Sequence, residues 1–265
     1  MTRSSVLRTL AVLTLTLFTS SLGISQQTIT LQGHPLVAPV YGYQIVKTYP
    51  HDPNAFTEGL FYLNGYLYES TGLTSESSLR KVDLDTGKWI LFHKVPNQYF
   101  AEGTTWWGNS ILQLTYMGQI GFVYDLGTFN ETGTFPYIGQ GWGLTQDGVH
   151  LIMSNGTCNL IFLDPSSYAQ TGQVCVHDGK NQIVNVNELE YIKGRVWANI
   201  YGSELIAVIR PTDGLVLAWI DTTGLRPPGS KVNVTNGIAY DPVLGRIFIT
   251  GKWWPNLYWI RYVHK

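Results

Sequence analysis

The chain has 265 residues, of which 44% are hydrophobic and only 13% are charged, and it contains 9 Trp, 16 Tyr and 10 Phe. This composition argues for a well-packed core and against disorder, and the length allows one large domain or two small ones. The formal net charge of −1 provides no electrostatic footprint for nucleic acid or for an anionic membrane, so neither is an expected partner.

The first 25 residues have the pattern of a secretory signal peptide. Arg3 and Arg8 precede an apolar run over residues 10–18, and small residues follow as far as Ser25. The run is too short for a membrane span, and the alternative interpretation is an uncleaved membrane anchor. Cleavage after Ser25 would place Gln26 at the mature N-terminus. We therefore expect a secreted or otherwise extracytoplasmic protein that is free of the membrane after cleavage.

The residues after the signal form an expected arm and an expected strand. Residues 26–40 are interpreted as an N-terminal arm on the surface. Residues 41–50, with the sequence YGYQIVKTYP, have the composition of a strand that precedes the repeated part of the chain.

Five similar units follow, at a period of roughly 45 residues. Each begins with a polar or aromatic residue and an anchor, continues through an apolar stretch and a turn, and ends in further β-rich runs. Turns such as Asn64-Gly65 and Asp147-Gly148 favour β-hairpins, because their central residues tolerate positive φ. The anchors are Gly59, Gly103, Gly143, Glu188 and Gly237.

Four short strands in a unit of this length are typical of a β-propeller blade. The sequence therefore predicts an all-β fold, a five-bladed β-propeller over residues 41–265, with an all-β sandwich as the alternative. The last unit lacks a convincing fourth strand, and residues 41–50 would supply it and close the ring, which hides exposed strand edges. A closed ring needs no partner, so a monomer is expected.

The cysteines and sequons fit an exported protein. Cys158 and Cys175 are an even pair in an oxidising compartment and are predicted to form one disulfide, which would stabilise the fold by about 3 kcal/mol; two free buried thiols are the alternative. Sequons at Asn130, Asn155 and Asn233 are predicted glycosylation sites if the host glycosylates. The six histidines show no metal-binding spacing, so neither a metal nor a cofactor is expected.

The residues around the anchors would crowd one end of the central channel of such a ring. They are Glu58, Glu102, Trp142, Asn187 and Asn236. Close packing of the innermost backbones explains the preference for Gly at the anchor positions. The residues beside the anchors would then form one polar pocket.

The two carboxyl groups in this pocket have a chemical consequence. Like charges in a narrow, partly dry site resist joint ionisation, so one pKa should rise, and a carboxyl poised near neutral pH can both accept and donate a proton. Lys252 would hold a carbonyl oxygen. In the structural alternative, Glu58 and Glu102 only bind backbone groups, Trp142 packs in the core and Lys252 is a solvated surface residue.

Several motifs, in order, resemble the plant-type glutaminyl cyclases from about Tyr41 to the C-terminus. They are "YPHDPNAFTEGLFY", "YESTGLTSESSLRKVDLDTGK", "YFAEG", "GWGLTQDG", "NELEYIKGRVWANIY" and "NGIAYDPVLGRIFITGKWWPNLYWI". The resemblance implies a five-bladed propeller that converts the N-terminal glutamine of peptides and proteins to pyroglutamate and releases ammonia. It also implies a distinction from the zinc-dependent animal-type cyclases.

The resemblance implies roles for individual residues. Glu102 of "YFAEG" resembles the proton-transfer residue of the family, and Trp142, Asn187 and Lys252 resemble its substrate-holding residues. Phe56 matches an aromatic residue of the first motif. On this basis Glu102 and Lys252 are the expected catalytic residues, and either Lys252 or the indole N–H of Trp142 is expected to stabilise the oxyanion.

Two features depart from the family pattern. Glu58 stands where the plant enzymes usually have Gln, and Tyr116 and Tyr201 stand where Trp is expected. With Asn236, these residues complete the predicted substrate-binding set. The alternatives are a secreted, non-catalytic propeller that binds peptides or glycans, and a calcium-dependent propeller hydrolase.

Overall fold

The computed structural model describes residues 28–265, and within this range the chain forms strands and turns but no helix. It follows that no helix there could cross a membrane. The predicted signal peptide over residues 1–25, and Gln26 after it, lie outside the described residues. The expectation of an all-β fold is confirmed.

Three antiparallel four-stranded sheets follow one another along the chain, as the repeat predicted. The first contains β4 (Thr57–Leu63), β5 (Tyr66–Thr71), β6 (Ser78–Asp83) and β7 (Trp89–Lys94). The second contains β8 (Ala101–Trp107), β9 (Ser110–Thr115), β10 (Ile120–Asp125) and β11 (Glu131–Pro136). The third contains β12 (Leu144–Gln146), β13 (Leu151–Ser154), β14 (Asn159–Leu163) and β15 (Gln170–Cys175).

The remaining long strands form one eight-stranded sheet, in the order β18-β19-β20-β21-β3-β24-β23-β22. These strands are β18 (Val186–Ile192), β19 (Arg195–Ile200), β20 (Leu205–Ile209), β21 (Val216–Asp221), β3 (Val40–Pro50), β24 (Asn256–His264), β23 (Arg246–Gly251) and β22 (Thr235–Asp241). Two small hairpins lie outside these sheets and consist of β1 (Thr30–Leu31) with β2 (His34–Pro35), and β16 (His177–Asp178) with β17 (Asn181–Gln182).

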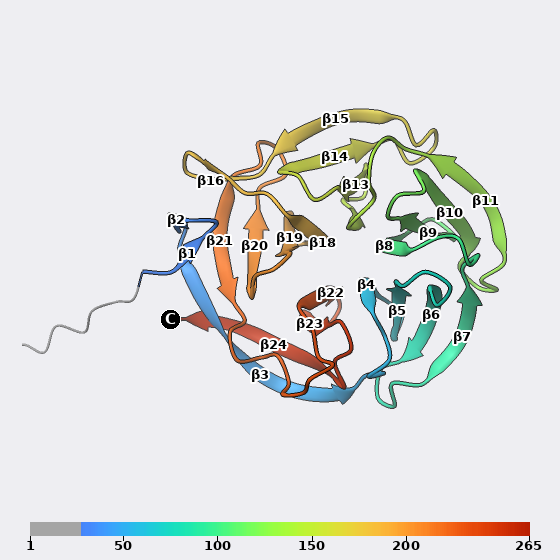
Figure 1. Cartoon of the computed structure of the whole chain (residues 1–265), viewed down its shortest axis with the longest axis horizontal. Helices are drawn as coiled ribbons and strands as arrows, with labels where there is room; N and C mark the ends of the chain where they lie inside the picture. Colours follow the sequence, from blue (N-terminus) through green and yellow to red (C-terminus); the bar gives the residue numbers. More distant parts are fainter. Residues whose placement is uncertain (1–27) are drawn as a thin grey trace, which may run out of the picture.

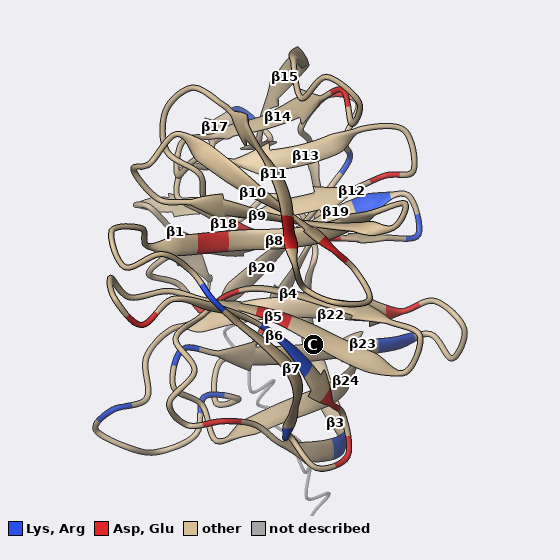
Figure 2. Ribbon diagram, turned by 90° about the vertical axis from the view of Figure 1, so that its right-hand side faces the viewer, with Lys and Arg blue, Asp and Glu red and all other residues tan. Residues whose placement is uncertain are grey.

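The sheets are arranged around one central axis, with β4, β8, β18 and β22 nearest to it (Figure 1). The innermost strands contact one another in a closed circuit, from β4 to β8, β12, β18, β22 and back to β4. Apolar side chains fill the spaces between neighbouring sheets, as the buried Phe61, Tyr68 and Ile111 do between the first two. Acidic and basic residues are interspersed over loops and strands (Figure 2), in keeping with the small net charge.

Strand β3 joins the two ends of the chain. It pairs antiparallel with β24, from Pro50↔Asn256 to Tyr41↔His264, as expected for residues 41–50. Its start also pairs parallel with β21, at Val40↔Trp219 and Tyr41↔Ile220. This double pairing covers what would otherwise be two open edges.

The described part of the arm, residues 28–40, is docked rather than free. The carboxylate of Asp178 accepts the backbone N–H groups of Val37 and Ala38 at 2.8 and 2.9 Å, together with the indole N–H of Trp219 at 2.9 Å. Leu31 and Leu36 pack against the core cluster that contains Trp219. One buried carboxylate therefore holds the arm against β21, the strand that carries Trp219.

The glycine anchors are needed because backbones from neighbouring sheets nearly touch. A Cβ atom added at Gly59 would lie 2.5 Å from the backbone N of Thr104, and one at Gly143 would lie 2.1 Å from the carbonyl O of Asn187. The fourth unit differs, since Glu188 uses its carboxylate to accept the backbone N–H of Leu60 at 3.1 Å and that of Ile238 at 2.8 Å. Crowding at the axis, expected from the repeat, is confirmed.

The predicted disulfide between Cys158 and Cys175 is present and links β15 to the residue before β14. The sequon residues Asn130 and Asn233 are exposed, and Asn155 is half-buried. Glycosylation at these positions stays a prediction.

Candidate active site

Two glutamates and a lysine meet at one end of the axis. Glu58 near the start of β4, Glu102 near the start of β8 and Lys252 just after β23 are 2%, 6% and 6% exposed. The ammonium Nζ of Lys252 donates to Oε1 of Glu58 at 2.7 Å. The low exposure of Lys252 is inconsistent with a solvated surface lysine, and the structure brings all three predicted residues together.

The two carboxyl groups are not equivalent. Burial raises the pKa of Glu58 to about 7, against the opposing charge of Lys252. Burial, and then the negative charge of Glu58, raise the pKa of Glu102 well above its ordinary value. The hydrogen bond between the two carboxyls favours ionised Glu58 and neutral Glu102. The direction of this coupling agrees with the expectation from the sequence.

Two buried amides connect this cluster to the fourth and fifth units. Asn236 is completely buried, and its Nδ2 donates to Oε2 of Glu58 at 3.1 Å and to the carbonyl O of Thr57 at 2.8 Å. Its Oδ1 accepts from Nδ2 of Asn187 at 3.1 Å. Oδ1 of Asn187 is buried without a hydrogen-bond partner among the described residues. Asn236 therefore positions Glu58, whereas Asn187 still has an acceptor to offer.

Six aromatic side chains surround the cluster in a chain of ring contacts, which we call the aromatic belt. Successive ring centroids along the belt are 4.6 to 6.4 Å apart. Lys252 nearly closes the circuit, since its Nζ lies 4.4 Å from the ring centroid of Phe56 and 5.8 Å from that of Tyr201. The members of the belt, in order, are Trp253, Phe56, Phe100, Tyr116, Trp142 and Tyr201.

The structure separates the two oxyanion donors considered from the sequence. The indole N–H of Trp142 donates to Oε1 of Gln140 at 2.9 Å, so it is already engaged. Trp142 is half-buried and contributes its ring to the belt rather than to a core cluster. Of the two groups, the ammonium of Lys252 is better placed to stabilise an oxyanion.

Two members of the belt were absent from the predicted substrate-binding set. Phe100 stands two residues before Glu102, as Phe56 stands two residues before Glu58, so the repeat itself contained the signal. Trp253 adopts a φ of 61° in the turn after β23, a conformation that a bulky residue adopts only under strong tertiary constraint. The sequence indicated its proximity to Lys252 but not its contact with Phe56.

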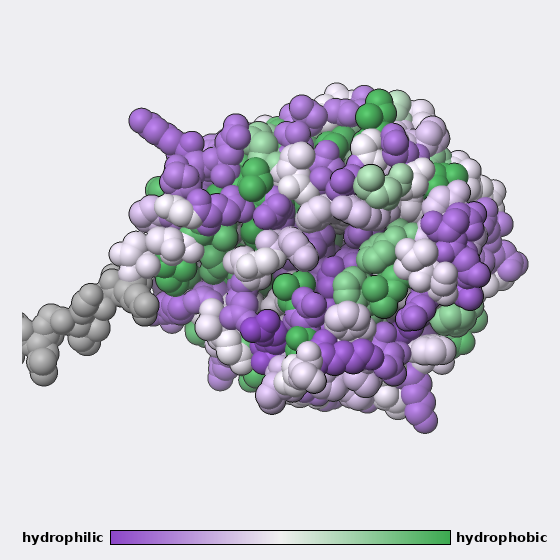
Figure 3. Space-filling view, in the orientation of Figure 1, coloured by the Kyte–Doolittle hydropathy of each residue, from purple (hydrophilic) through white to green (hydrophobic). Residues whose placement is uncertain are grey.

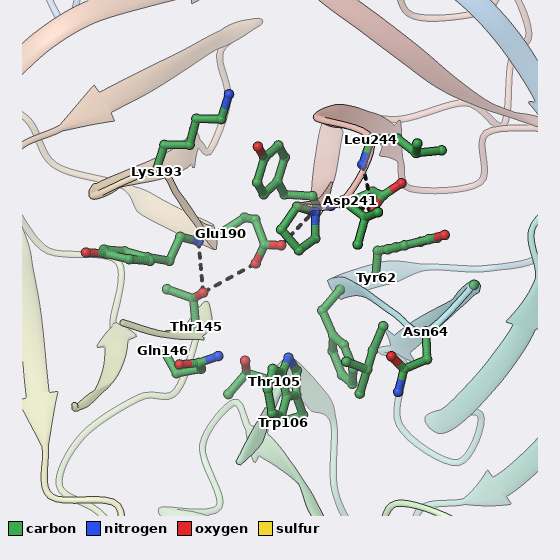
Figure 4. A pocket seen from close by; sticks show the side chains of 17 residues that line it. Tyr62, Asn64, Thr105, Trp106, Thr145, Gln146, Glu190, Lys193, Asp241 and Leu244 are labelled. Atoms are coloured by element: carbon green, nitrogen blue, oxygen red, sulfur yellow. Dashed lines mark hydrogen bonds between the residues drawn. The ribbon is translucent and has the colours of Figure 1, made fainter. Parts of the chain in front are cut away.

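A cavity of about 660 Å³ lies at the opposite end of the innermost strands (Figure 4). It is lined by residues near their far ends, including Leu63, Trp106, Glu190 and Asp241, and by none of the predicted site residues. In Figure 4 the carboxyl of Glu190 points toward the middle of this cavity. The face of the molecule seen along the direction of Figure 1 has a hollow near its centre (Figure 3).

Within residues 28–265, no group of three or more His, Cys, Asp or Glu side chains is arranged to hold a metal ion. A buried carboxyl pair with raised pKa values, held beside a buried lysine and enclosed by aromatic rings, is an arrangement that can act as acid and base toward a small polar group. The fold and site thus define an all-β enzyme with a general acid–base centre on its axis.

Comparison with known proteins identifies the family. The glutamine cyclotransferase family profile matches residues 12–262. A glutaminyl-peptide cyclotransferase from Arabidopsis thaliana is 43% identical over 225 residues, which are 82% of this chain and 70% of the relative. The crystal structure of Myxococcus xanthus glutaminyl cyclase superposes with a TM-score of 0.80 at 33% identity and covers 85% of this chain and 98% of its own. The chain belongs to the glutamine cyclotransferase family.

Proposed function

We propose that this protein is a glutaminyl-peptide cyclotransferase, which converts the N-terminal glutamine of peptides and proteins to pyroglutamate and releases ammonia. The observation that carries the proposal is the buried Glu58–Glu102 pair beside Lys252, inside the aromatic belt. The Arabidopsis relative is named a glutaminyl-peptide cyclotransferase and the Myxococcus relative a glutaminyl cyclase, which supports the same activity.

We infer that the catalytic domain, residues 41–265, is a five-bladed propeller. The closed circuit of β4, β8, β12, β18 and β22 supports five blades. On this interpretation the eight-stranded sheet is two blades, joined by the short parallel pairing of β21 with β3. Residues 26–40 are the arm, and closure within one chain supports a monomer.

The reaction forms a bond between the substrate's α-amine nitrogen and its side-chain amide carbon, and breaks the bond from that carbon to the amide nitrogen. The amine attacks as the free base. Neutral Glu102 gives its proton to the departing nitrogen, which leaves as ammonia, and takes a proton from the attacking nitrogen. One carboxyl can serve both because the two nitrogens are bonded to the same carbon in the tetrahedral intermediate. Glu102 ends the cycle as it began, and the steps use only groups of this chain.

The other site residues bind and orient the substrate. The ammonium of Lys252 stabilises the charge that develops on the carbonyl oxygen, and Glu58 keeps that ammonium in place and raises the pKa of Glu102. The free acceptor of Asn187 takes an N–H of the substrate amide. The aromatic belt encloses the side chain in a folded conformation close to that required for attack, which supplies much of the rate enhancement.

The test is ammonia release from a peptide that begins with Gln. Glu102→Gln should lower kcat by at least about 100-fold. Glu190→Gln, a change of another buried acid at the opposite end of the axis, should leave kcat within about twofold. Wild-type turnover by Glu102→Gln would remove Glu102 from the mechanism.

The same assay separates the alternatives. Binding of a Gln-initiated peptide without ammonia release would favour a non-catalytic propeller, and loss of activity with a chelator would favour a metal-dependent enzyme.

The pattern of residues 1–25 and the Cys158–Cys175 disulfide support a secreted protein. The mass of the mature N-terminus tests cleavage after Ser25, and deglycosylation tests the sequons.

A further inference from the structure

We propose that His51 is a positioning residue, and that its ring works in the doubly protonated, positively charged form to fix the turn that carries Lys252. The turn comprises residues 251–255. The inference rests on the proposed function, because Lys252 is the group whose placement matters for the reaction. It assigns a task to a buried histidine that the mechanism above leaves unused.

The contacts of the ring determine its protonation. His51 is 9% exposed, and its Nδ1 lies 2.6 Å from the carbonyl O of Trp254, which can only accept a hydrogen bond. Its Nε2 lies 2.9 Å from Oε1 of Glu69, an oxygen that also accepts from the hydroxyl of Thr57 at 2.7 Å. If Glu69 is ionised, both ring nitrogens must carry protons, and the ring is an imidazolium.

The surrounding charges favour this ion pair. Burial opposes the charge of His51, but the charge of Glu69, the hydrogen bonds to Glu69 and Trp254 and the charge of Asp52 together raise the pKa of His51 above its ordinary value. Burial likewise opposes ionisation of Glu69, yet His51 and then Arg80 hold the pKa of Glu69 below its ordinary value. Asp52 also favours the charged ring, and Arg80 binds Asp52 at 2.9 Å. Lys88 lines the same shallow cavity as His51.

The backbone around the ring ties the segment 51–55 to the turn. The N–H of His51 donates to the carbonyl O of Pro255 at 3.0 Å, and the N–H of Trp253 donates to that of Ala55 at 2.7 Å. The ring supplies the third link, to Trp254. The turn presents Lys252 and Trp253 to the site, and the segment leads directly into Phe56. The three links therefore set where the lysine lies relative to the first strand.

The pH dependence follows from the direction of the shift. The pKa of His51 is raised in the folded protein. Its ring is therefore fully charged at pH values below the ordinary histidine pKa, and it loses the charge as the pH rises through the raised pKa. Loss of the proton leaves either Trp254 or Glu69 without a donor. Catalysis should then decline on the alkaline side, in kcat more than in KM, because the oxyanion stabiliser moves.

Three variants test the inference. Glu69→Gln removes the charge that stabilises the imidazolium, so the alkaline limb of the kcat profile should move to lower pH by at least about one unit. His51→Asn keeps a donor toward Trp254 but no charge, and kcat should fall about 10- to 100-fold. The matched control is His150→Asn, since His150 also faces an acid, Asp147, but at a half-exposed hairpin, and its profile should equal that of the wild type.

A direct measurement keeps the inference testable if a variant fails to fold. The ¹⁵N spectrum of the histidine rings in the wild-type protein should show one ring with both nitrogens protonated at pH 7, with a raised titration midpoint. A neutral His51 ring at pH 7, or a Glu69→Gln profile that matches the wild type, would overturn the inference. Failure of the wild type to release ammonia would instead overturn the proposed function, and it would leave the ring spectrum unchanged.

Discussion

Replacing Glu58 by Gln restores the residue that the plant-type enzymes are expected to have, and it isolates the effect of one charge. In the wild-type protein the negative charge of Glu58 and its hydrogen bond both raise the pKa of Glu102. A glutamine at position 58 can still offer its amide oxygen to Lys252, which now lies 2.7 Å from Oε1. The substitution therefore removes the charge but preserves most of the geometry.

The magnitude follows from the kind of contact that is lost. A hydrogen bond to a charged group contributes about 1.5–3 kcal/mol, and one pKa unit corresponds to about 1.4 kcal/mol. The pKa of Glu102 should thus fall by about one to two units in Glu58→Gln. Because Glu102 acts first as an acid, the alkaline limb of kcat should move to lower pH by the same amount.

The assay is the rate of ammonia release from a Gln-initiated peptide between pH 5 and pH 9, at saturating substrate, for wild type and Glu58→Gln. The ring spectrum of His51 should be unchanged in this variant, which distinguishes the shift from one caused by the Lys252 turn. Glu190→Gln serves as the control and should keep the wild-type profile. Superimposable profiles for Glu58→Gln and wild type would refute the coupling of the two carboxyls.

Three further predictions concern substrate orientation and stability. Asn187→Ala removes the free acceptor and should lower kcat/KM about 10- to 100-fold. Its kcat should not show the large loss expected for Glu102→Gln. Unchanged kinetics would exclude Asn187 from the site. Burial raises the pKa of Glu190 to about 8, so its ionisation opposes folding as pH rises above about 4.5. Glu190→Gln should therefore recover roughly 4 kcal/mol at pH 8 in urea unfolding, with no gain at pH 4. The double change Cys158→Ser and Cys175→Ser should lower the free energy of unfolding by about 3 kcal/mol, and an unchanged urea midpoint would contradict this.

The repeat in the sequence was sufficient to predict the strands and to bring the candidate site residues together at one end of the axis. Glycine anchors, hairpin turns and the spare strand over residues 41–50 are local signals, and the contacts of Gly59 and Gly143 show why they were informative. The repeat also places Glu58 and Glu102 at equivalent points, so their meeting could be predicted without coordinates.

The contacts that the sequence could not predict depend on the direction of individual side chains and on the closure of the ring. His51 contacts the carbonyl of Trp254, 203 positions away, only because β3 pairs with β24. No residue pattern shows that Asn236 uses all its hydrogen bonds within the protein, whereas Asn187 keeps one acceptor free. The engagement of the Trp142 indole by Gln140 is equally a matter of rotamer choice.

The proposed mechanism does not use the cavity of about 660 Å³ at the opposite end of the axis, and the surroundings of Glu190 give the reason. At that end Glu190 accepts hydrogen bonds from the backbone N–H of Tyr240 at 2.9 Å and from the hydroxyl of Thr145 at 3.3 Å. Neither donor carries a charge, and burial raises the pKa of Glu190 without any cation to oppose it. Glu188 is also buried nearby, and burial and then the charge of Glu190 raise its pKa, but no lysine of the described residues distinguishes these two acids as Lys252 distinguishes Glu58 from Glu102.

At the other end, Lys252 opposes the rise in the pKa of Glu58 and so favours its negative charge, and that charge in turn raises the pKa of Glu102. The difference between two chemically identical side chains is thus created by one lysine, which the turn after β23 delivers and which the aromatic belt keeps from bulk water. Acid–base chemistry on a bound glutamine depends more on this difference in pKa between the two carboxyls than on the volume of the cavity. In the proposed mechanism, the position of the Lys252 ammonium and the contacts that fix its turn therefore decide which end of the axis carries the reaction.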